Sequence, residues 1–143
     1  MADKKNTILT RFIGNKKLLD KTGFPMQVIF IKRKDEEGLS TWDISNFIDK
    51  KDELKIYELG DKEYAKKPPY TIGRCDLKKG DIDSLFEKIG SKFPNINYNI
   101  ITRNLLKWRH KEICFNTSDN PALAYHIAQE LLNIAIYKKR PKL

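Results

Sequence analysis

The fold is decided near the C-terminal end of the chain, where residues 121–137 read PALAYHIAQELLNIAIY. Apolar side chains recur there at the spacing i, i+4, i+8 and i+11, which places them on one face of an α-helix. They are Leu123, Ile127, Leu131 and Ile134. Asp119 can serve as the N-cap, and a proline suits the first turn. The sequence therefore predicts a helix over residues 121–137 that buries this stripe.

The rest of the chain alternates between strand-like and helix-like patterns. Strands are predicted at residues 7–13, 26–32, 54–59, 70–75, 97–102 and 112–116, and helices over residues 41–50 and from Asp81 to about residue 90. Residues 26–32 are almost wholly apolar, as in a central strand buried on both faces. The order strand, strand, helix occurs three times. This order predicts a single α+β domain of two layers, with a mostly antiparallel sheet covered by about three helices. The domain spans residues 1–143 and ends in a short basic tail, residues 138–143.

Length and composition exclude several classes of protein. With 143 residues, 40% of them hydrophobic, the chain can bury one core, and wholesale disorder is excluded. No apolar run approaches the roughly 20 residues of a membrane span, and no signal-like stretch follows Met1, so we expect a cytoplasmic protein without membrane contact. Cys75 and Cys114 are the only cysteines and no metal-ligand spacing occurs, so we expect no disulfide, metal or cofactor. Phosphate-binding glycine loops and nucleophile elbows are absent as well, which argues against the common nucleotide-dependent and hydrolytic enzymes.

Positive charge is in excess and is concentrated late in the sequence. Lys and Arg number 28 against 19 Asp and Glu, a net charge of +9. The last 43 residues alone hold 8 basic and 3 acidic side chains. Such an excess favours an anionic partner, either nucleic acid or an acidic protein.

Residues 103–111, which read RNLLKWRHK, carry the most informative pattern and are called the basic segment below. Its cations can contact phosphates while its tryptophan stacks on a base. The candidate binding residues are Arg103, Lys107, Trp108, Arg109, His110 and Lys111. Alternatively, the tryptophan packs beneath a hairpin and the cations form a solvated turn. The tail adds three further candidates, either as cations that complement the end of the last helix or as an arm along a phosphate backbone. These are Lys138, Lys139 and Arg140.

The leading hypothesis is a basic, non-catalytic domain that binds RNA or DNA. One alternative is an interaction module, such as a phage or bacterial accessory protein, that binds an acidic protein partner. Another is a small nuclease in which His110 acts as the base, with Glu112 on the same face of a strand. A nuclease could also use Glu53 and Lys55, whose spacing occurs in metal-dependent nucleases, although ordinary surface charge explains that pair better.

Overall fold

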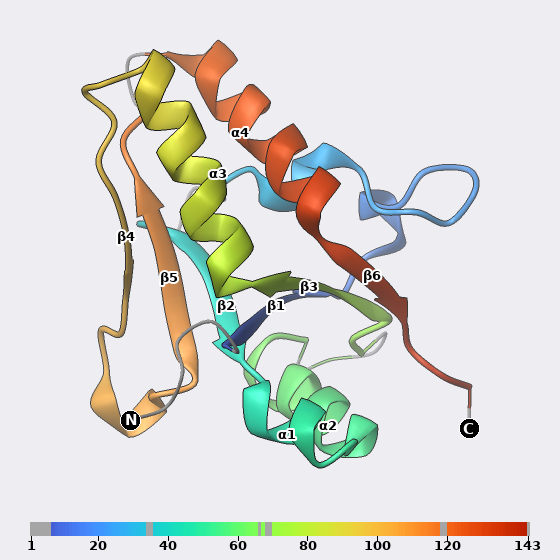
Figure 1. Ribbon diagram of the computed structural model, residues 1–143. Helices are drawn as coiled ribbons and strands as arrows, with labels where there is room; N and C mark the ends of the chain where they lie inside the picture. Colours follow the sequence, from blue (N-terminus) through green and yellow to red (C-terminus); the bar gives the residue numbers. More distant parts are fainter. Residues whose placement is uncertain (1–6, 34–35, 66, 68–69, 118–119, 143) are drawn as a thin grey trace.

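An antiparallel sheet forms the centre of the molecule (Figure 1). The computed structural model describes residues 7–33, 36–65, 67, 70–117 and 120–142. The strands are β1 (Ile8–Ile13), β2 (Leu39–Asp43), β3 (Gly73–Lys78), β4 (Tyr98–Ile101), β5 (His110–Phe115) and β6 (Ile136–Lys139). They lie in the order β4-β5-β2-β1-β3-β6, and each neighbouring pair is antiparallel.

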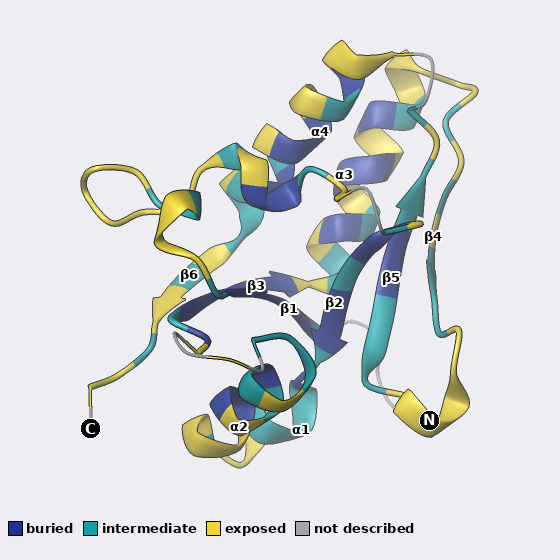
Figure 2. Cartoon of the chain, turned by 180° about the vertical axis from the view of Figure 1, so that it is seen from behind, coloured by how far each residue is buried: buried dark blue, intermediate teal, exposed yellow. Residues whose placement is uncertain are grey.

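Helices lie on both faces of the sheet. The α-helices are α1 (Ser45–Asp49), α2 (Glu53–Glu63), α3 (Lys79–Lys92) and α4 (Pro121–Ile134). Three short 3-10 helices are η2 (Lys16–Leu18), η3 (Gln27–Phe30) and η4 (Leu105–Lys107). The helices α3 and α4 run side by side over one face, and α1 and α2 lie beneath the other (Figures 1 and 2). The predicted single α+β domain with an antiparallel sheet is confirmed. Among the described residues, no helix combines the length and the apolar character needed to cross a bilayer.

Each face of the sheet buries its own core because neighbouring side chains of a strand point to opposite faces. Leu9 and Ile13 of β1 belong to the larger cluster, which α3 and α4 cover. Phe12, between them in sequence, joins Trp42 and Ile56 in a smaller cluster under α1 and α2. A Cβ atom at Gly60 of α2 would lie 2.8 Å from the Phe12 ring, so glycine allows this helix to approach the sheet closely.

The C-terminal helix has the predicted buried stripe but ends earlier than expected. Leu123, Ile127 and Leu131 are buried, and Ile134, the last helical residue, is partly buried. The chain then enters β6, which pairs with β3, so the predicted helix over residues 135–137 is wrong. Asn120 is the N-cap, because its side chain accepts a hydrogen bond from the Leu123 N–H at 3.0 Å. The predicted cap, Asp119, lies outside the described residues.

Residues 26–32 do not form the predicted central strand. They contain η3, which buries Ile29 and Phe30 and leaves Met26 and Val28 exposed. A short apolar run has no periodicity that separates a strand from a buried helical turn. The central positions of the sheet are taken by β1 and β2 instead.

In two further segments the predicted type of secondary structure is wrong: a strand was predicted as a helix, and a helix as a strand. Residues 39–43 form β2, and the helix predicted over residues 41–50 begins only at Ser45, where Asp43 accepts hydrogen bonds from the Ser45 N–H and hydroxyl. Residues 54–59, predicted as a strand, belong to α2. Asp52 is the N-cap of α2 and accepts a hydrogen bond from the Lys55 N–H at 3.2 Å, which favours the start of a helix here. The alternation of apolar and polar residues in this segment resembles a strand pattern, so the sequence alone did not show the helix.

Candidate nucleic-acid interface

The basic segment forms the turn from β4 to β5 at one edge of the sheet, where Figure 2 shows exposed residues. The Asn104 side chain caps η4 by accepting a hydrogen bond from the Leu106 N–H at 3.0 Å. Leu105 and Leu106 are 83% and 94% exposed, and Trp108 is 49% exposed. The ring of Trp108 is therefore accessible, and the alternative in which it packs as a core residue does not hold.

Arg109 is fixed by its neighbours. Its guanidinium lies 4.1 Å from the centre of the Phe47 ring and 4.4 Å from that of Trp108. One of its terminal nitrogens donates to the Asp43 carbonyl at 3.0 Å and to Asn46 Oδ1 at 2.7 Å. Burial lowers the pKa of Arg109. These contacts fasten α1 to the turn and hold Trp108 in place.

Arg103 and Lys111 are also engaged in contacts within the protein. Arg103 forms ion pairs with Glu112 and, at 2.9 Å, with Glu37. Lys111 Nζ donates to the Thr102 hydroxyl at 2.8 Å. Because neighbours on β5 point to opposite faces, Lys111 lies on the other side of the sheet from His110. The structure thus divides the basic segment between two faces.

Lys107 and His110 instead line an open cleft of about 870 Å³, called the Trp42 cleft below. Its aromatic wall consists of Trp42 of β2, the His110 ring 5.2 Å from it, and Tyr64 at the end of α2, whose ring centre is 6.3 Å from that of Trp42. A smaller hollow of about 220 Å³ shares Trp42, Lys107 and His110 with this cleft and is also lined by Trp108. The exposed tryptophan and the cleft therefore form one continuous surface.

Among the described residues, three cationic side chains from distant parts of the chain line the Trp42 cleft: Arg33, Lys67 and Lys107. Lys107 is 60% exposed, and its ammonium lies 3.3 Å from Glu63. An exposed ion pair of this kind is weak and can open at little cost. Arg33 forms an ion pair with Glu36 at 3.5 Å, and its guanidinium lies 5.3 Å from the centre of the Tyr64 ring, so it is positioned above the aromatic wall.

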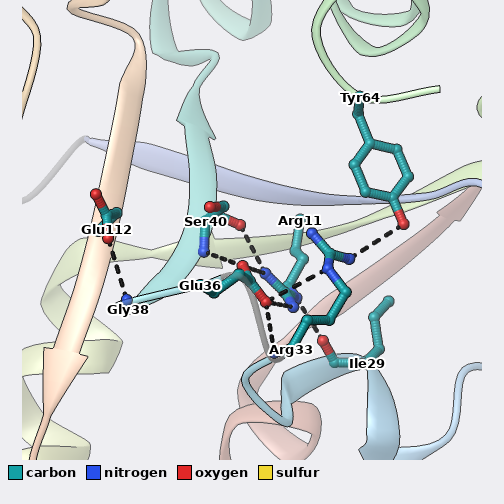
Figure 3. A network of polar contacts seen from close by, with 8 residues as sticks. All are labelled: Arg11, Ile29, Arg33, Glu36, Gly38, Ser40, Tyr64 and Glu112. Atoms are coloured by element: carbon teal, nitrogen blue, oxygen red, sulfur yellow. Dashed lines mark hydrogen bonds and ion pairs between the residues drawn. The ribbon is translucent and has the colours of Figure 1, made fainter. Parts of the chain in front are cut away.

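A buried ion pair shapes the loop that forms one side of the cleft (Figure 3). Glu36 receives two hydrogen bonds of 3.0 Å from Arg11, and the backbone N–H groups of Arg33 and Ser40 donate to it at 2.8 Å. Burial alone would raise the pKa of Glu36, but the hydrogen bonds and charge of Arg11 outweigh it and lower that pKa to about 2. Glu36 is thus held as a carboxylate that fixes this loop and supplies no unpaired charge to the cleft.

His110 and Glu112 do share a face of β5, as a nuclease pair would require. Glu112, however, is buried, and each of its oxygens already accepts a hydrogen bond. One bond comes from the Gly38 N–H at 3.1 Å and the other from the Arg103 guanidinium. Such a carboxylate supports the turn and is poorly placed to orient His110 for proton transfer.

In the basic tail, Lys138, Lys139 and Arg140 neither form a free arm nor lie at the end of the last helix, which ends at Ile134. Lys138 and Lys139 belong to β6, at the edge of the sheet opposite β4 and the basic segment. Arg140 is bound to Asp61 through two contacts of 3.0 Å and donates to the Thr71 carbonyl at 2.9 Å. The sequence-predicted residues therefore fall at two opposite edges, and only those near the Trp42 cleft lie together.

Sequence reasoning missed the other half of the cleft: Trp42, Tyr64, Arg33 and Lys67. Trp42 falls within the helix predicted over residues 41–50, and the remaining three lie in segments with only loop composition. The available signal is that Trp42 is one of only two tryptophans, but its partner strand β5 follows it by nearly seventy residues.

Comparison with known proteins adds no assignment, because no family model, curated protein or solved structure matches this chain. Within the described part of the chain, no group of three or more His, Cys, Asp or Glu side chains could hold a metal ion. Burial raises the pKa of the Cys75 thiol to about 12, so it would be protonated and unreactive at neutral pH.

Proposed function

We propose that this protein binds single-stranded nucleic acid in the Trp42 cleft, without catalysing a reaction on it. The observation that carries the proposal is the juxtaposition of three cations, Arg33, Lys67 and Lys107, with an aromatic wall and the exposed Trp108. Cations attract phosphates, and an accessible ring offers a stacking face. In a single strand the faces of the bases are accessible, whereas in a duplex they are stacked on one another.

The proposal assigns separate roles to the charges and the ring. Lys107 contributes mainly electrostatic attraction, whereas Trp108 contributes stacking of about 1–3 kcal/mol per base. Arg109 acts indirectly, because its position between Phe47 and Trp108 orients the tryptophan. His110 contributes a planar wall beside Trp42.

Fluorescence anisotropy with a labelled single-stranded oligonucleotide, as RNA and as DNA, tests this proposal. Trp108→Ala should weaken binding by about 1–3 kcal/mol while leaving the dependence on salt almost unchanged. Lys107→Glu should weaken binding to all sequences and reduce the salt slope by about one phosphate contact or more.

Lys139→Glu is the matched control, because Lys139 is exposed at the opposite edge of the sheet. It makes the same change in net charge and should alter binding much less than Lys107→Glu. Wild-type binding by both Trp108→Ala and Lys107→Glu would refute the proposal. A loss of folding stability in Trp108→Ala of the size of about 3–5 kcal/mol that buried aromatics give would also count against it.

A second candidate function, binding of an acidic protein partner, is favoured by the exposure of Leu105 and Leu106. Adjacent exposed leucines beside cations suit an interface in which an apolar contact is surrounded by charge pairs. Replacing Leu105, which does not line the cleft or the hollow beside it, with serine distinguishes the two candidates. Nucleic-acid binding through the Trp42 cleft should survive this change, whereas an interface built on the leucines should not.

A further inference from the structure

A second pocket, which shares no lining residue with the Trp42 cleft, lies between the α1–α2 connection and the strands β3 and β6. Its volume is about 340 Å³, within the range of small-molecule sites. Three lysines from three separate parts of the chain line it: Lys51, Lys78 and Lys138. We call it the Lys51 pocket.

A buried arginine already engages the carboxylates of this pocket, so they offset the charge of the lysines only in part. Arg74 is fully buried and lies 3.0 Å from Asp76 and 2.7 Å from Glu53. Among the described residues, none of the three lysines forms an ion pair with a carboxylate. Four cations therefore face two carboxylates, and the pocket has a net positive charge.

The backbone at Lys51 explains how this lysine is positioned at the end of α1. Its φ angle is +55°, and it is the one residue other than glycine with a positive φ in the described part of the chain. Glycine or asparagine usually occupies such a position after a helix, because a longer side chain is strained there. The N–H groups of Lys51 and Asp52 donate to the carbonyls of Ile48 and Phe47 at 3.0 and 2.8 Å, the usual left-handed end of a helix, so the end of α1 fixes Lys51 beside the pocket.

The remaining wall of the pocket is apolar. Ile8, Phe47, Ile48 and Ile136 line it, and Ile136 is 48% exposed although it lies within β6. A bare inorganic anion would leave these side chains uncovered, and a neutral apolar molecule would leave the lysines without a partner. We propose that the Lys51 pocket binds a small amphiphilic anion, in which one phosphate or carboxylate group is carried on an apolar body. This site is independent of nucleic-acid binding in the Trp42 cleft.

Isothermal titration calorimetry on the full chain tests the ligand class with four probes. Octyl phosphate and octanoate, both below their micellar concentrations, have the anionic head and the apolar body; inorganic phosphate and octanol each have only one of them. At least one amphiphile should bind about tenfold more tightly than either control probe, and the tighter of the two identifies the head group. Equal binding of all four probes, or binding of none, would overturn the proposal.

Lys51→Gly tests the site because it removes the ammonium and also relieves the left-handed backbone. The variant should bind the preferred amphiphile about tenfold more weakly, the loss expected for one charge-assisted contact, and melt at the same or a higher temperature. Lys138→Gln should weaken binding similarly. Lys139→Gln is the control, because this residue follows Lys138 on the opposite face of β6 and should bind the amphiphile as wild type does. Wild-type affinity in Lys51→Gly, or an equal loss in Lys139→Gln, would show that the pocket is not the site.

Discussion

Among single residues, Glu36 links the loop beside the Trp42 cleft to the buried cation Arg11. The pKa of Glu36 is about 2 in the folded protein, against an ordinary value of 4.5, because Arg11 outweighs the effect of burial. A carboxylate with a lowered pKa stabilises the fold above its unfolded pKa, and this stabilisation disappears as the pH falls through the folded pKa. The contribution of Glu36 is therefore complete at neutral pH and lost between about pH 5 and about pH 2.

Glu36→Gln should consequently destabilise the protein by about 3 kcal/mol at neutral pH, since it leaves Arg11 buried without its counter-charge. The difference from wild type should shrink as the pH falls toward about 2. Urea unfolding at a series of pH values measures both effects. Glu58→Gln, at an exposed position of α2, is the control and should change the free energy of unfolding by less than about 0.5 kcal/mol. A Glu36→Gln deficit that stays constant at all pH values would contradict this account.

At the scale of elements, α4 is held to the sheet by the face that contains Leu131, which is fully buried. Leu131→Ala should cost about 2–5 kcal/mol, because it removes apolar contacts and leaves a cavity. The identical substitution at Leu106, which is 94% exposed, should have almost no effect on the thermal midpoint. Equal midpoints for the two variants would show that α4 does not pack as described.

The last strand, β6, is an integral part of the sheet, and its removal can be tested. β6 pairs with β3, and Arg140 continues the contact through its backbone bond to the Ile72 carbonyl at 3.0 Å and its ion pair with Asp61. Removing residues 136–143 should destabilise the protein strongly, because it exposes the edge of β3 and the core beside it. Removing only residues 141–143 should leave the thermal midpoint unchanged, since these contacts remain. If the longer truncation were harmless, residues 136–140 would be a loose tail and not a strand.

For the molecule as a whole, the sequence predicted features that rest on local periodicity. The stripe on α4 and the helix beginning near Asp81 follow from local sequence signals, so the α+β class could be recognised. The segment around Ile29 could not, because a short apolar run fits a 3-10 helix and a strand equally well. The sequence indicated the candidate site only in part, for a related reason. Lys107 and Trp108 are neighbours in sequence, whereas Trp42 reaches them only through the pairing of β2 with β5.

The distribution of positive charge over the whole molecule determines how strongly nucleic-acid binding should depend on salt. The net charge is +9, but among the described residues three cations line the Trp42 cleft, and the lysines of β6 lie at the opposite edge of the sheet. Each phosphate neutralised on a single strand contributes about −0.7 to the slope of log K against log salt concentration. Binding confined to the cleft should therefore give a slope of about −2, whereas participation of the entire net charge would give about −6.

Anisotropy titrations between low and moderate salt measure this slope, with the double variant Lys138→Gln, Lys139→Gln as the control that should leave it unchanged. A slope near −6, or one that falls in the control, would mean that the strand binds across the whole basic surface and that the cleft does not define the site.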